Sequence, residues 1–187
     1  MKIIFLLEEE SMKALLDILL PKILPNGIEF YTIPHNGKTD LRRSIPRKLR
    51  GWNEPGDVRF VVVHDQDSHD CMALKDELLQ LCEPCKKTVL IRIVCQELEA
   101  WYFGDLNAVG QAYGDTYKPE MIKGLSAKAK FRFPDKVINP KEELERIIPL
   151  YQEVSGARKI APFMDVNLNS STSFMAFVNG VRKFISA

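Results

Sequence analysis

Four short apolar segments in the first half of the chain alternate with stretches of helical periodicity. The apolar segments are KIIFLLE at residues 2–8, IEFYTI at 28–33, VRFVVVHD at 58–65 and TVLIRIVC at 88–95. A near-continuous apolar run such as KIIFLLE is typical of a buried parallel strand, whereas IEFYTI alternates between apolar and polar residues as a strand does. Between them, residues 12–19 and 71–82 carry apolar positions at helical spacing. Strands separated by helical crossovers predict an α/β fold, with a mainly parallel four-stranded sheet flanked by helices in a Rossmann-like arrangement.

The second half shows no further strand pattern. It contains helical stretches at PKEELERII, residues 140–148, and SFMAFVNGVRKFI, residues 173–185, and a lysine-rich loop at SAKAKFRFPDK, residues 126–136. There is no internal repeat and no low-complexity linker, and the length of 187 residues is near the usual size of one domain. We therefore predict a single domain over 1–187, with an α/β core at 1–104 and a mostly helical extension at 105–187.

Composition limits the classes of protein to be considered. The chain is 45% apolar with a net charge of only +1, so any surface that binds nucleic acid must be local. No apolar run is long enough to span a membrane, and the short first run leads into three glutamates instead of a cleavage site, so we expect a cytoplasmic protein. Cys82 and Cys85 have a CxxC spacing, but no second pair completes a zinc site, which favours reduced thiols.

Acidic residues follow three of the four predicted strands. They are Glu8, Glu9 and Glu10 after the first strand, Asp65, Asp67 and Asp70 after the third, and Glu97 and Glu99 after the fourth. Ligands of open parallel sheets bind at the carboxyl ends of the strands, so these acids are expected to converge there. Hard oxygen ligands without histidine or thiolate favour Mg²⁺ or Mn²⁺. The alternative is that acids such as Glu9, Glu10 and Asp70 complement the dipoles of helices that begin there.

Two clusters of basic residues are candidates for contact with a nucleic acid. The first consists of Arg42, Arg43, Arg47, Lys48 and Arg50, and the second of Lys128, Lys130, Arg132 and Lys136 interleaved with Phe131 and Phe133. Basic residues beside aromatics suit a phosphate backbone and stacked bases. A run of charges is also typical of a plain solvated helix face, and that alternative stays open.

Several further polar residues are candidates for supporting roles. HNGKTD, residues 35–40, lies between a strand and a helix, but it lacks the first glycine of a phosphate-binding loop. Lys38 is a candidate to reach a phosphate at the sheet edge, or else a solvated lysine in a turn. His35, His69 and Arg92 are candidates to orient ligands or balance charge around the metal; Arg92 is alternatively only a strand residue that pairs with a nearby acid. For His64, at the end of a strand, we expect a hydrogen-bonded, partly buried imidazole.

A glutamate closing the first strand and a DxD closing a later strand resemble the Toprim domain of topoisomerases, bacterial primases and the nucleases of the overcoming-lysogenisation-defect group. LLEEES, HNGKTDL, DQDSHDC, RIVCQELEAWYFGD, KFRFPDK and NLNSSTSF together resemble a bacterial family of uncharacterised Toprim-like proteins, a domain of unknown function, over nearly the whole chain. The resemblance implies that Glu8, Asp65 and Asp67 bind the metal and that Glu8 is a metal ligand or general base. It makes Glu97 and Glu99 further candidate ligands.

The resemblance implies hydrolysis of a phosphodiester. Glu9 stands where typical Toprim domains have glycine, and the extra domains of topoisomerases and primases are absent, so a nuclease is the simplest activity. Glu8, Asp65, Asp67 and Lys38 are then the expected catalytic residues, with Asp70 as a further metal ligand. The overcoming-lysogenisation-defect group pairs its Toprim domain with an ATPase, so the resemblance also implies a separate ATPase partner, with a role in phage defence.

Two alternatives compete with this hypothesis. The chain could instead be a non-catalytic subunit that binds metal or nucleic acid. The DxD also occurs in phosphatases of the haloacid-dehalogenase type, which place it after the first strand and follow it with threonine or valine. Here it follows the third predicted strand and precedes Ser68, which argues against that family.

Overall fold

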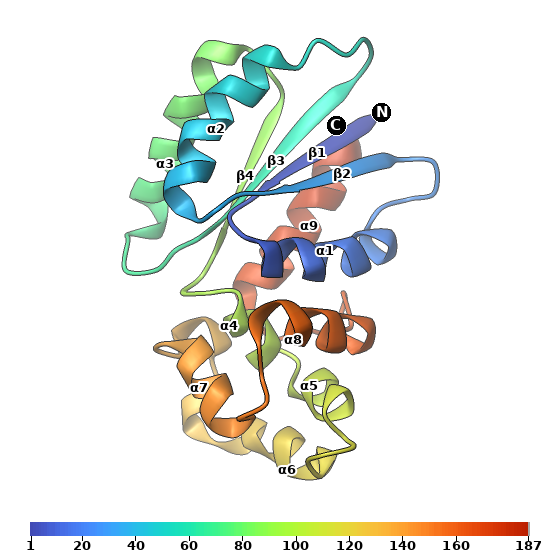
Figure 1. Cartoon of the computed structure of the whole chain (residues 1–187), viewed down its shortest axis with the longest axis vertical. Helices are drawn as coiled ribbons and strands as arrows, with labels where there is room; N and C mark the ends of the chain where they lie inside the picture. The colour runs from blue at the N-terminus through green and yellow to red at the C-terminus, as the bar shows by residue number, and fades with distance from the viewer. Residues whose placement is uncertain (187) are drawn as a thin grey trace.

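The computed structural model describes residues 1–186, which form a four-stranded sheet and the helices around it (Figure 1). The strands are β1 (Lys2–Leu7), β2 (Glu29–Pro34), β3 (Val58–Asp65) and β4 (Val89–Val94). They lie in the order β2-β1-β3-β4, and every neighbouring pair is parallel. The prediction of an α/β fold with a parallel four-stranded sheet is therefore confirmed.

The central positions of β1 and β3 in the sheet explain why their sequences are almost continuously apolar. Side chains alternate across a strand, so Ile3, Phe5 and Leu7 pack on one face of β1 while Ile4 and Leu6 pack on the other. Helices α1 (Glu10–Ile23) and α9 (Thr172–Ser186) cover the first face, and α2 (Lys38–Gly51) and α3 (Cys71–Cys82) cover the second. Both faces of β1 and β3 are therefore buried.

The rest of the chain lies beyond the carboxyl ends of the strands (Figure 1). It contains α4 (Glu99–Phe103), α5 (Leu106–Ala112), α6 (Pro119–Lys123), α7 (Pro140–Ile147) and α8 (Glu153–Ile160), with short 3₁₀ turns between them. Helix α8 packs against α1, and the Lys22 ammonium of α1 donates to the carbonyls of Ala161, Pro162 and Met164. No helix within residues 1–186 is long and apolar enough to cross a membrane.

A polar cluster joins the start of α9 to the lysine-rich loop. The Asp135 carboxylate accepts from the Ser171 and Ser173 hydroxyls at 2.6 and 2.9 Å and from the Ser173 N–H at 2.8 Å. The Ser173 hydroxyl in turn accepts from the Trp101 indole N–H at 2.9 Å, and the Asn169 amide donates to the Trp101 carbonyl. The NLNSSTSF segment therefore connects α9, α4 and the turn at Pro134–Lys136.

Candidate functional site

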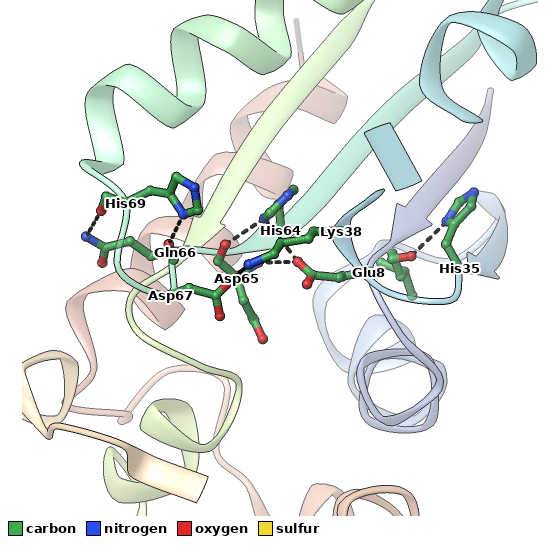
Figure 2. A network of polar contacts seen from close by, with 9 residues as sticks. Glu8, His35, Lys38, His64, Asp65, Gln66, Asp67 and His69 are labelled. Carbon is green, nitrogen blue, oxygen red and sulfur yellow. Dashed lines mark hydrogen bonds and ion pairs between the residues drawn. The ribbon is translucent and has the colours of Figure 1, made fainter. Parts of the chain in front are cut away.

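The ends of β1 and β3 meet through Glu8 and Asp65 (Figure 2). The Glu8 carboxylate accepts from the Asp65 backbone N–H at 3.0 Å, and its Oε2 lies 3.0 Å from His64 Nδ1. His64 Nδ1 also lies 2.6 Å from the Asp65 carbonyl, so this nitrogen carries the proton and donates to both oxygens. Burial lowers the pKa of His64, so its contact with Glu8 is a hydrogen bond of a neutral imidazole and not an ion pair.

The DxD turn continues the edge of the sheet from Asp65 to Asp67. Asp67 has a left-handed backbone, φ 50°, and its N–H donates to the Gln96 carbonyl at 2.9 Å. Its carboxylate accepts from the Lys38 ammonium at 2.9 Å. Lys38 is the first residue of α2, directly after Gly37, whose N–H donates to the Glu8 carbonyl. The loops after β1, β2 and β3 are thus joined around one edge (Figure 2).

Negative charge at this edge is poorly compensated. Asp65 is only 8% exposed, and its Oδ1 is buried without a hydrogen-bond partner. Burial, followed by the charges of Glu8, Glu99 and Glu9, raises the pKa of Asp65 well above its ordinary value. Burial likewise raises the pKa of Glu8, although the Asp65 N–H opposes the change. The fold therefore holds at least one carboxyl here that ionises only at a cost.

A second buried acid lies behind these residues. Glu99 accepts from the Tyr151 hydroxyl at 2.5 Å, and its burial raises its pKa to about 7. The buried Tyr102 hydroxyl has no partner, and the charges of Glu99, Glu9 and Asp65 add to burial in raising the pKa of Tyr102. The charge of Glu99 thus acts on the acids at the edge of the sheet, although its hydrogen bond is to Tyr151 in the helical part.

The donors at this edge match a hard divalent cation in chemistry. Glu8, Asp65 and Asp67 offer carboxylate oxygens, and the Oδ1 of Asp65 is a buried acceptor with no hydrogen-bond partner. Within residues 1–186, however, no three His, Cys, Asp or Glu side chains are grouped so that they would hold a metal ion as they stand. The Asp67 carboxylate is instead paired with the Lys38 ammonium.

Two of the predicted metal ligands have other partners. Asp70 is exposed and caps α3, since its Oδ1 accepts from the backbone N–H groups of Met72 and Ala73 at 3.0 and 2.9 Å. The alternative interpretation of Asp70 as a helix cap is therefore correct. Glu97 accepts from the Lys141 backbone N–H at 3.0 Å, at the start of α7. It remains near the DxD turn, since both line the pocket described below.

The predicted supporting residues do not gather around the acids. His35 is buried and its Nδ1 lies 2.8 Å from the Leu7 carbonyl, while His69 is exposed and its Nδ1 lies 3.3 Å from the Gln66 carbonyl. Arg92 lies in the middle of β4 against Gly180 of α9 and donates to the Ile91 carbonyl. In the described part of the chain, Arg92 therefore neither compensates charge at the strand ends nor pairs with an acid.

A pocket of about 370 Å³ opens beside the DxD turn. It is lined by Asp67, Ser68, Gln96, Glu97, Ile138 and Asn139. The first four belong to the edge of the sheet and the last two to the helical part, so the pocket lies between these parts. A larger hollow of about 500 Å³ lies between α3 and the amino end of β4, away from the strand ends that carry the acids.

Comparison with known proteins gives the family. A family model described as Domain of unknown function (DUF4276) matches residues 7–182. The chain belongs to the DUF4276 family. Among curated proteins, none matches the sequence.

Solved structures were also compared with this DUF4276 chain. The C-terminal region of the Burkholderia pseudomallei OLD protein aligns with a TM-score of 0.55 and 19% identity, over 98% of this chain and 96% of that one. The C-terminal region of the Xanthomonas campestris pv. campestris OLD protein aligns with a TM-score of 0.49 and 17% identity, over 99% and 93%. The first similarity shows a shared fold.

The two predicted basic clusters differ in their surroundings. In α2, Arg42 pairs with Glu77 of α3 at 2.5 Å, and Arg47 donates to the Arg43 carbonyl. In the second cluster, Lys128, Lys130, Arg132 and Lys136 are all exposed. This cluster also lies next to the pocket, because Lys130 and Lys136 line a second hollow that shares Ile138 and Asn139 with it.

Sequence reasoning missed the partners that define this edge. His64 was expected to be a hydrogen-bonded imidazole, but not to hold Glu8. Gln96, Asn139 and Tyr151 were not singled out at all. Gln96 carries one detectable signal, since it directly follows a predicted strand. Asn139 and Tyr151 reach the edge only through the packing of the helical part, which leaves no local pattern in the sequence.

Proposed function

We propose that this DUF4276 chain is a divalent-metal-dependent phosphodiesterase that acts on nucleic acid, with Mg²⁺ or Mn²⁺ as its ion. The observation that carries the proposal is the buried Asp65 carboxyl, which has an unpaired oxygen beside Glu8 at the carboxyl edge of a parallel sheet. A buried carboxyl in negative surroundings is costly for the fold unless a cation or a proton compensates it. Perturbed acids of this kind are typical of functional sites.

Each residue at the edge would then have a role. Glu8, Asp65 and Asp67 would hold the ion, which when bound supplies polarisation of the phosphate and a lower pKa for an attacking water. His64 fixes the orientation of Glu8 by donating its Nδ1–H. Lys38 would leave Asp67 and bring its ammonium to the phosphate. The resemblance of Glu8 and the DxD to the Toprim pattern supports this assignment.

Hydrolysis of labelled DNA and RNA, measured with and without Mn²⁺, tests the proposal. We expect Mn²⁺-dependent cleavage that Glu8→Gln and Asp67→Asn each reduce by at least about 100-fold, since both lose charge-bearing ligands. Asp70→Asn is the matched control, because it changes an aspartate of the same loop that caps a helix, and it should keep its activity. Equal activity of all three variants would show that the cleavage comes from elsewhere.

One observation favours a second candidate, a non-catalytic subunit that binds metal or nucleic acid. Asp67 is already neutralised by Lys38, as would suit a site that is completed only with a partner, such as a separate ATPase. Manganese binding by calorimetry together with the cleavage assay separates the candidates. Binding that Glu8→Gln abolishes, without cleavage of any nucleic acid, would favour the binding subunit.

A further inference from the structure

The segment at residues 128–139, here called the basic segment, contains the second basic cluster and ends at the pocket. It runs through two short 3₁₀ turns, Ala129–Phe131 and Pro134–Lys136. Its last two residues, Ile138 and Asn139, line the pocket together with Asp67 and Glu97. A chain bound along this segment would therefore be led toward the acidic edge of the sheet.

The two phenylalanines of the basic segment have opposite environments. Phe131 is 7% exposed and stacks on Phe103, with ring centroids 4.9 Å apart and planes 2° apart. Phe133 is 58% exposed and belongs to neither hydrophobic cluster. Only Phe133 is therefore free to offer its ring to a ligand.

The position of Phe133 is fixed from both sides. Phe131 anchors the chain two residues before it, in the core. Asp135 anchors the chain two residues after it, through its bonds to Ser171 and Ser173 at the start of α9. An exposed aromatic on a fixed backbone loses little entropy when a planar group stacks on it, so this arrangement is suited to binding.

A positive charge lies over the exposed ring. The Lys136 ammonium lies 5.2 Å from the centroid of Phe133, and Arg132 is exposed beside it in sequence. Lys130 pairs with Glu143 at 2.6 Å, but its side chain remains about half exposed. Cations next to an exposed ring match a ligand that carries both phosphates and planar bases.

We infer that the basic segment binds single-stranded nucleic acid, with an unpaired base stacked on Phe133 and phosphates on Arg132 and Lys136. This inference deepens the proposed phosphodiesterase, since it names the substrate as a single strand. A duplex keeps its base faces stacked inside, whereas an unpaired base has a free face for an aromatic side chain. The exposed Phe133 ring in the basic segment therefore favours the single strand.

Fluorescence anisotropy with a labelled 12-nucleotide adenine oligomer, as DNA and as RNA, tests the inference in EDTA, where no cleavage is needed. We expect Phe133→Ala to weaken binding by about 5- to 150-fold, because stacking on an aromatic contributes ~1–3 kcal/mol per base. Phe133→Trp should retain binding. Phe163→Ala is the matched control, because Phe163 is also a largely exposed phenylalanine, 46% exposed, in a 3₁₀ turn outside the basic segment.

A salt titration adds a second readout for phosphate contacts. Lys136→Ala should lower the slope of log affinity against log salt by about 0.7, the value for one phosphate contact on a single strand, while Phe133→Ala should leave it unchanged. The same label on a duplex of equal length should bind more weakly than the single strand and should not respond to Phe133→Ala.

Three results would overturn the inference. They are equal affinity of Phe133→Ala and Phe163→Ala for the single strand, tighter binding of the duplex, or no binding by the wild type. If the first of these results came with a loss of self-association in Phe133→Ala, the ring would be assigned to a protein contact. Because binding is read without metal, strand binding that depends on Phe133 without any cleavage would refute only the phosphodiesterase.

Discussion

The two ends of the aspartate loop place the same side chain in opposite situations. Asp65, where β3 ends, is buried with an unpaired oxygen and a strongly raised pKa. Asp70, five residues later, is exposed and has its carboxylate satisfied by two backbone N–H groups of α3. The fold gains stability from Asp70 and loses stability to an ionised Asp65. The comparison distinguishes Asp70, which stabilises the fold, from Asp65, whose destabilising burial is better explained by binding of a ligand.

Asp65→Asn gives the largest expected effect on this comparison. Manganese affinity should fall by more than about 100-fold, since the loss of an outer contact alone costs 10- to 100-fold. The metal-free protein should meanwhile become more stable, because a neutral amide avoids the desolvation cost of a buried carboxylate. Calorimetry with manganese and a denaturant titration in EDTA measure the two quantities.

Asp70→Asn is the control for that experiment. It keeps a side-chain oxygen that can cap α3, so both its manganese affinity and its stability should stay near the wild-type values. An equal loss of manganese affinity in both variants would remove the distinction between the two ends of the loop.

Manganese itself should stabilise the wild type. At a free concentration 100 times its Kd, binding to the folded state adds about 2.7 kcal/mol to the free energy of unfolding. For a chain of this size this corresponds to a rise in melting temperature of about 5–10 °C. Thermal unfolding with and without the ion measures it, and the rise should be absent in Asp65→Asn. A similar rise in that variant would indicate a site elsewhere.

Stability without metal should fall as the pH rises from about 4.5 to 7. The folded chain keeps a proton on Glu99 up to its pKa of about 7, while the unfolded chain releases it near the ordinary value of 4.5. The unfolded state therefore binds fewer protons in this window, and stability declines with pH, by at most about 1.4 kcal/mol per pH unit for one group.

Glu99→Gln should make this decline shallower, since glutamine can still accept from Tyr151 but does not titrate. Denaturant titrations of both proteins at pH 5, 6 and 7 measure the slopes. Asp65 and Glu8 also have raised pKa values, so part of the decline in stability with pH should remain in Glu99→Gln. Identical slopes in the two proteins would contradict the assignment to Glu99.

The smallest effect is expected at the other end of the loop. Asp70→Ala removes the cap of α3 and should lower the free energy of unfolding by about 1 kcal/mol. The melting temperature should fall by about 2–4 °C, measured by circular dichroism. Manganese binding should not change, and a loss of binding would return Asp70 to the list of metal ligands.

Local patterns were enough to predict the sheet. The strand predicted at 58–65 is the observed β3, and the other three differ by one residue at their ends. The continuous apolar runs of β1 and β3 encode burial on both faces, as expected of strands in the centre of a parallel sheet. The convergence of Glu8 with Asp65 and Asp67 also followed from this, because parallel strands bring their carboxyl ends to one edge.

The contacts that assign each acid its role could not be predicted. Glu97 and Glu99 are two residues apart, yet one accepts from the Lys141 N–H and the other from the Tyr151 hydroxyl. Both partners lie more than 40 residues away in the sequence, Lys141 in α7 and Tyr151 between α7 and α8, and no local pattern encodes how this part packs on the sheet. The same holds for Phe131 and Phe133, which alternate in sequence but differ in exposure because Phe103 stacks on only one of them.

The bonds of Asp135 make two distant parts of the chain a single unit of cooperative unfolding. Asp135 belongs to the basic segment, and Ser171 and Ser173 belong to the start of the helix that covers one face of the sheet. Opening of that helix would release the segment as well, because the carboxylate would lose three partners at once. Backbone amides of residues 130–139 should therefore exchange with solvent at a rate linked to that of α9, although about 40 residues separate them in the sequence.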